Sequence, residues 1–111
     1  MDYALECRDV AVIVAVRGRV DESSWEKFGE GLSKAIGQAQ QAELTQVIID
    51  LTDLDYMSSR GLRALTVGKR QGEEAGIQLS LASPNEVMRE ILSISRYDKL
   101  FTISDTIESR R

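Results

Sequence analysis

Apolar residues follow two different periods in the first part of the chain. Tyr3, Leu5 and Cys7 alternate with small or polar residues, which predicts a half-buried strand. Residues 10–16 are Val, Ala or Ile throughout, a pattern typical of a strand buried on both faces. Because only a short turn separates the two runs, we expect a hairpin, with Gly18 bending the chain after it.

The next segment has the period of a helix that Ser23 or Ser24 caps. Its apolar residues recur at steps of three and four: Trp25, Phe28, Leu32, Ala35, Ile36 and Ala39. Glycines at positions 29, 31 and 37 weaken such a helix by up to about 1 kcal/mol each relative to alanine. We therefore expect packing against a sheet to hold it.

The pattern then alternates between strands and helices. Residues 47–51 predict a short buried strand, and residues 52–55 a polar connection. A second helix is expected over residues 59–75, with Gly76 as its C-terminal stop. Alternation over residues 77–82 predicts another strand.

The last third of the chain opens with helix-start chemistry. Ser83 occupies the expected cap, Pro84 the first helical position, and Glu86 completes a capping box. A last strand is expected over residues 101–103 and a short helix over residues 106–111. The order ββαβαβαβα predicts an α/β domain with a central mixed sheet and helices packed largely on one side.

The composition of the chain excludes several classes of function. A chain of 111 residues with 42% hydrophobic residues fits one domain, and its net charge of −4 argues against a nucleic-acid partner. The absence of histidine removes Ser-His-Asp catalysis and His-containing zinc sites. We expect no membrane insertion, because the longest apolar run, residues 10–16, is far below the roughly 20 residues of a span, and no secretory leader is visible. The single Cys7 fits a reducing cytoplasm.

Other candidates for chemistry are weak. Asp50, Asp53 and Asp55 are a dense group of carboxylates that either gather magnesium or simply serve turns and solubility, and we favour the second interpretation. Phosphorylation on Asp50, as in a receiver domain, is a further alternative. No nucleophile has a neighbouring base and no phosphate loop is present, so we expect neither an enzyme nor a cofactor.

Two adjacent serines, Ser58 and Ser59, stand at the predicted start of the second helix. Only one can cap the helix, and a phosphate on the other would be stabilised by roughly 1 kcal/mol by the free N–H groups and the helix dipole. Arg60 and Arg63 add positive charge, and Gly61 keeps the first turn free of a side chain, so a partner's backbone can approach. These features predict a phosphoserine site on an exposed rim.

The same stretch resembles a family signature. Residues 51–65, Leu-Thr-Asp-Leu-Asp-Tyr-Met-Ser-Ser-Arg-Gly-Leu-Arg-Ala-Leu, resemble that of the STAS domain, named for sulfate transporters and anti-sigma factor antagonists. Residues 18–21, Gly-Arg-Val-Asp, resemble the family's Gly-x-apolar-Asp turn. The resemblance implies that residues 1–111 form a single STAS domain, with four to five strands and about four helices. A chain of this size is similar to the bacterial anti-sigma factor antagonists.

The resemblance also implies a mechanism. The unmodified protein binds an anti-sigma factor that is also a serine kinase, which frees a sigma factor. The kinase then phosphorylates the antagonist, the complex dissociates, and a serine phosphatase resets it. The phosphoserine maps to Ser59, with Ser58 as cap or secondary acceptor. The expected partner-binding residues are Asp21, Ser58, Arg60, Gly61 and Arg63, of which Arg60 and Arg63 rest on proximity alone.

Ser58 is also a departure from the family pattern, because many members carry Asp immediately before the phosphoserine. This motivates an alternative: a STAS module that is never phosphorylated and acts as a scaffold or adaptor in a signalling or transporter complex.

Overall fold

The computed structural model describes residues 1–106, which form a five-stranded sheet in the order β1-β2-β3-β4-β5. β1 pairs with β2 in an antiparallel hairpin, and the pairs from β2 to β5 are parallel. The strands are β1 (Asp2–Cys7), β2 (Val12–Val20), β3 (Gln46–Met57), β4 (Gln78–Ala82) and β5 (Ile103–Ser104). The helices are α1 (Trp25–Gln41), α2 (Ser59–Glu74), α3 (Glu86–Ile94) and a 3-10 turn, η1 (Tyr97–Lys99). The predicted α/β class with a mixed sheet is confirmed.

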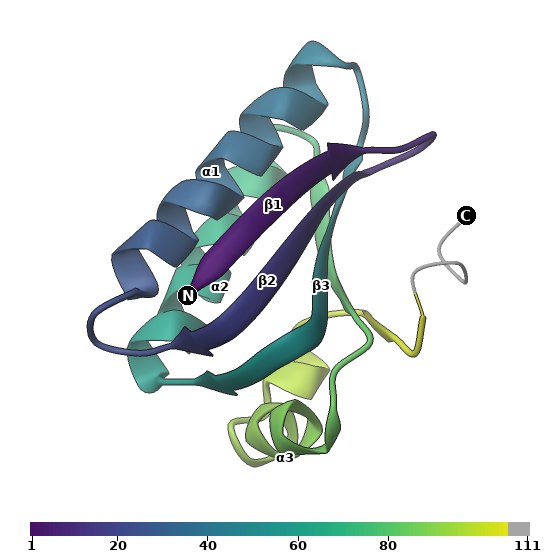
Figure 1. Cartoon of the computed structure of the whole chain (residues 1–111). Helices are drawn as coiled ribbons and strands as arrows, with labels where there is room; N and C mark the ends of the chain where they lie inside the picture. The colour runs from purple at the N-terminus through teal and green to yellow at the C-terminus, as the bar shows by residue number, and fades with distance from the viewer. Residues whose placement is uncertain (107–111) are drawn as a thin grey trace.

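α1 and α2 lie side by side against one face of the sheet, and α3 lies near the carboxyl end of β3 (Figure 1). Phe28 and Leu32 of α1, Leu65 of α2 and Met88 and Leu92 of α3 belong to one buried cluster with the inward side chains of the strands. The apolar stripe predicted for α1 is thus buried, except that Trp25 is only partly covered. Since the strands on either side of α1 and of α2 are parallel, these two helices run in the same direction.

β3 is longer than its sequence pattern predicts. The expected polar connection over residues 52–55 is wrong: the strand continues to Met57, with Leu54 fully buried and Met57 only 2% exposed. The register between β2 and β3 shifts twice, between Ala15 and Arg17 and between Gly18 and Arg19. β3 therefore carries an extra residue at each point, and its buried positions change from steps of two to steps of three. β2 likewise continues past Gly18, which takes a φ of +92°.

The start of α3 also differs from the prediction. Ser83 lies in the left-handed region with a φ of +57° and does not cap the helix. The cap is Asn85, whose backbone is extended and whose Oδ1 accepts a hydrogen bond of 2.9 Å from Met88 N. The predicted last strand begins two residues later, at Ile103, after η1. Of the helix expected over residues 106–111, all but Thr106 lies outside the described residues, and Thr106 is not helical.

Within residues 1–106, none of the helices combines the length and the apolarity needed to cross a membrane.

Candidate phosphorylation and partner-binding site

The carboxyl ends of β2 and β3 bring the two sequence motifs together. Val20 pairs with Met57 at the end of the parallel ladder, and Ser58 N donates a hydrogen bond of 2.8 Å to Val20 O. The turn that leads from β2 into α1 therefore lies beside the first turn of α2. Residues 18–21 and 58–63, which are far apart in the sequence, form one edge of the molecule.

The two serines have different roles at this edge. Ser58 has an extended backbone and is 9% exposed, and its Oγ accepts a hydrogen bond of 3.3 Å from Gly61 N. Ser58 is therefore the N-cap of α2, one of the two roles predicted for it. Ser59 is the first residue of α2 and is exposed, and within the described part of the chain its hydroxyl has no hydrogen-bonding partner. The geometry leaves the Ser59 oxygen accessible to a docking enzyme.

Position 61 requires a glycine for a different structural reason from the one expected. Gly61 is buried, and a Cβ atom at this position would lie 2.6 Å from Met57 Cγ and 2.7 Å from Val20 Cγ1. The glycine is therefore required because α2 approaches the strand ends closely. The expectation that it leaves room for a partner's backbone is corrected by this inward orientation.

Asp21 organises the turn before α1. Its Oδ1 accepts hydrogen bonds from Ser23 Oγ at 2.8 Å and from Ser23 N at 3.0 Å, with Ser24 Oγ at 3.1 Å. The Ser23 hydroxyl foremost, then the Ser23 amide and the Ser24 hydroxyl, lower the pKa of the Asp21 carboxyl, and the positive charge of Arg19 acts in the same direction. Asp21 is thus held as a carboxylate beside α2.

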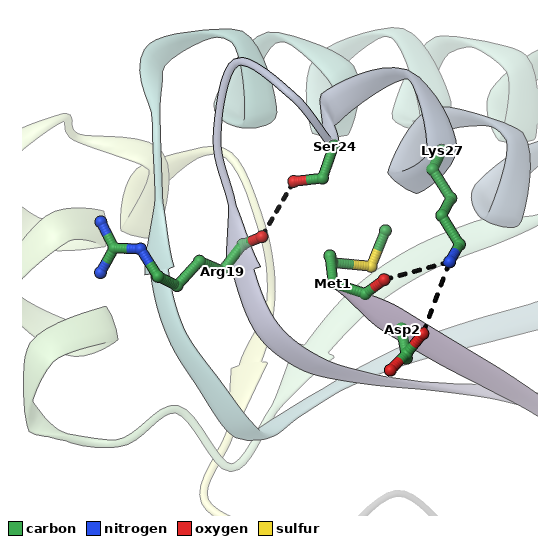
Figure 2. A network of polar contacts seen from close by, with 5 residues as sticks. All are labelled: Met1, Asp2, Arg19, Ser24 and Lys27. Atoms are coloured by element: carbon green, nitrogen blue, oxygen red, sulfur yellow. Dashed lines mark hydrogen bonds and ion pairs between the residues drawn. The ribbon is translucent and has the colours of Figure 1, made fainter.

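Ser24 occupies the N-cap position of α1, but its hydroxyl does not cap the helix. Figure 2 shows it turned towards the strand, where Oγ donates to Arg19 O at 2.9 Å. The same view shows Lys27 reaching Met1 O at 3.1 Å and Asp2 Oδ1 at 3.4 Å, which ties the start of the chain to α1. The expected cap by Ser23 or Ser24 is therefore replaced by a link between β2 and α1.

Arg60 and Trp25 form a contact that the sequence pattern did not predict. Arg60 Nε lies 3.3 Å from Glu22 Oε2, and its guanidinium carbon lies 5.5 Å from the centre of the Trp25 ring. Both charged side chains are well exposed, so the ion pair itself adds at most about 1 kcal/mol. Its effect is to link the start of α1 to Arg60, the residue that follows Ser59. No local signal in the sequence pairs these positions.

Arg60 and Arg63 also line a groove of about 880 Å³ between α1 and α2. Arg63 is exposed and has no salt bridge within residues 1–106. The groove begins beside the first turn of α2, so the expected partner-binding residues adjoin a concave surface.

The three aspartates of β3 show no metal-binding arrangement. Asp50 Oδ1 accepts hydrogen bonds from Thr52 N at 3.1 Å and Thr52 Oγ1 at 2.6 Å. Asp53 and Asp55 are exposed along the strand. In the described part of the chain, no three Asp, Glu, His or Cys side chains are grouped so that they could hold a metal ion.

Fold and site together define a small domain in which two strand ends present the exposed start of a helix. The family model of the STAS domain matches residues 2–110, and the chain belongs to this family. The protein BtrV of Bordetella bronchiseptica, whose name describes it as a candidate anti-sigma factor antagonist, is 25% identical over 109 residues, which cover 98% of this chain and 90% of BtrV.

Solved structures share the fold. The unphosphorylated anti-sigma factor antagonist SpoIIAA matches with a TM-score of 0.78 and 22% identity over 98% of this chain and 92% of the other. The phosphorylated form of SpoIIAA, described as a Bacillus cell fate determinant, matches with a TM-score of 0.69 and 23% identity over 98% and 96% of the two chains. The predicted STAS fold is confirmed.

Proposed function

We propose that this chain is an anti-sigma factor antagonist, and that phosphorylation of Ser59 switches its binding off. The observation that carries the proposal is that the two adjacent serines have different structural roles. Ser58 is buried and holds the cap, while Ser59 is exposed with no hydrogen-bonding partner in residues 1–106. The relative BtrV and the structural neighbour SpoIIAA are both named as antagonists of anti-sigma factors, and SpoIIAA has been solved with and without its phosphate.

The proposed partner is an anti-sigma factor that is also a serine kinase, and a serine phosphatase reverses its action. In this proposal the partner docks on the edge that joins the β2–α1 turn to the start of α2, the edge that carries Asp21, Ser59, Arg60 and Arg63. The chain itself catalyses nothing in this cycle and acts in the cytoplasm.

The switch follows from charge. A phosphate adds about −1.5 to −2 charge at pH 7. At the centre of a packed interface this charge is desolvated or repelled, at a cost of several kcal/mol. A loss of about 4 kcal/mol weakens binding roughly a thousandfold. Since Ser59 is already at the surface, no change of fold is needed.

The test uses a candidate partner of the proposed class, an anti-sigma factor with serine kinase activity. The purified proteins are incubated with ATP, the modified residue is located by mass spectrometry, and affinities are measured by calorimetry. Ser59→Ala should bind the kinase and accept no phosphate, and Ser59→Asp should bind weakly. Ser58→Ala is the matched control and should still be phosphorylated on Ser59. Phosphate found only on Ser58, or on neither serine, would refute the assignment.

The alternative is a STAS scaffold or adaptor that is never phosphorylated. It is favoured by one feature, the presence of Ser58 where many relatives carry a carboxylate. A scaffold would bind its partner with equal affinity as Ser59→Ala and as Ser59→Asp, and the same calorimetric series therefore separates the two functions.

A further inference from the structure

The solvent face of α1 and α2 is a second surface of this molecule with an organised charge pattern. The two helices run parallel and side by side (Figure 1). Small residues line the groove between them, namely Gly29 from α1 and Ala64 and Gly68 from α2. Val67 is 49% exposed beside them. Gly29 leaves open space on the α1 side of the groove, and Val67 supplies apolar area to cover.

At the end of the groove where α2 begins, its two rims carry opposite charges. Glu26 and Glu30 lie one helical turn apart on the α1 rim, with Lys34 one turn further on, and Arg60 and Arg63 lie one turn apart on the α2 rim. Arg60 pairs with Glu22. Within residues 1–106, Glu26, Glu30 and Arg63 form no salt bridge at all. The face thus has an acidic row and a basic row at the same end of two parallel helices.

This pattern is complementary to itself under one twofold rotation. An axis parallel to the helices places α1 of each copy on α2 of the other, so each acidic row meets a basic row, twice. An axis perpendicular to the helices in the same plane would place α1 on α1 and α2 on α2, so no acidic row would meet a basic row. Only the first arrangement pairs Glu26 and Glu30 with Arg60 and Arg63 of the other copy.

We propose that this face binds a second copy of the chain and forms a twofold dimer, with α1 of each copy packed on α2 of the other. The helices have 17 and 16 residues, so the face is about 25 Å long and, at about 10 Å per helix, about 20 Å wide. This gives an area of roughly 500 Å² for each copy, below the roughly 800 Å² of a standard interface. The dimer is therefore weak, and its formation depends on protein concentration and on salt.

The dimer does not depend on the proposed function and is measured on the protein alone. Sedimentation equilibrium at low salt should show a monomer–dimer equilibrium that added salt shifts towards the monomer. Glu26→Arg with Glu30→Arg makes both rims basic, and Arg60→Glu with Arg63→Glu makes both acidic. Each double variant should raise the dissociation constant by at least about tenfold, because like charges then face each other.

The decisive step is to mix the two double variants. An all-basic and an all-acidic copy are complementary on both rims, so the mixture should form a heterodimer at concentrations where each variant is a monomer. Glu86→Arg with Glu90→Arg on α3 makes the same charge change at the same spacing and should leave the dimer intact. Circular dichroism verifies that each variant is folded.

Three results would overturn the proposal. They are a wild-type chain that stays monomeric at low salt into the high micromolar range, a dimer that survives both charge reversals, and folded double variants that do not associate when mixed.

Discussion

Gly61→Ala tests whether α2 is seated against the strand ends as tightly as the structure shows. A Cβ atom at this position would lie 2.6 Å from Met57 Cγ and 2.7 Å from Val20 Cγ1. Both distances are far below ordinary carbon–carbon contact. Val20 is fully buried and β-branched, so its side chain is stiff and yields little space. The strand end or the first turn of α2 must therefore move.

The change in the free energy of unfolding caused by Gly61→Ala is the sum of two opposing effects. Overpacking of a well-packed site costs about 1–3 kcal/mol. Alanine is a better helix former than glycine by at most about 1 kcal/mol, and by less in the first turn than in a helix interior. Overpacking wins, and we expect Gly61→Ala to lower the free energy of unfolding by about 1–2 kcal/mol.

Gly37→Ala is the matched control. Gly37 lies inside α1, and a Cβ atom there would have no neighbour within 4 Å. Only the helix-propensity effect remains, so this variant should be more stable than wild type by about 0.5–1 kcal/mol. Equilibrium urea unfolding, followed by circular dichroism and by the fluorescence of the single Trp25, measures both. The reasoning is refuted if Gly61→Ala is as stable as Gly37→Ala.

Three further substitutions, and Ser59→Ala as a control, test the caps and the turn. Ser58→Ala removes the cap of α2 and should lower the free energy of unfolding by about 1 kcal/mol, whereas Ser59→Ala should leave it unchanged in the same urea titration. Asn85→Ala removes the cap of α3 and leaves Leu54 O without its 2.8 Å hydrogen bond, so a loss of about 2 kcal/mol or more is expected, and a loss below that of Ser58→Ala would contradict it. Asp21→Asn should be destabilising at neutral pH. Because the folded-state pKa of Asp21 lies below its usual 3.8, the stabilisation by its carboxylate is present above pH 3.8 and is lost as the pH falls through the lowered pKa, so the gap between wild type and variant should close in acid.

The elements of this fold follow from local patterns wherever the period is regular. The alternation in β1, the apolar run in β2 and the stripe in α1 each predict the element that forms. For β3 the local pattern fails at Leu54 and Met57, because two register shifts against β2 change the spacing of the buried residues and polar side chains lie between them. The extra residues are set by pairing with another strand, and a local pattern does not contain that information.

The features of the candidate site also divide into those that local sequence predicts and those that it does not. The cap by Ser58 and the exposure of Ser59 follow from helix-start chemistry, which involves only neighbouring residues. The packing of Gly61 on Val20 and the contact of Arg60 with Glu22 do not, because those partners come from the β2–α1 segment about forty residues earlier. The motif resemblance pointed to two segments that the structure brings together at one edge, but it did not reveal the inward role of the glycine.

The free amides of α2 lead to a further prediction about the proposed switch. Ser58 N, Gly61 N and Leu62 N are all hydrogen-bonded, whereas in residues 1–106 the amides of Ser59 and Arg60 have no partner. A phosphate on Ser59 would lie beside these amides at the positive end of the helix dipole, which stabilises it by roughly 1 kcal/mol. The phosphorylated chain should therefore be at least as stable as the unmodified chain in urea, although it binds its partner far more weakly. If phosphorylation instead lowered the free energy of unfolding by several kcal/mol, the switch would act by disrupting the fold, and the interface mechanism would be wrong.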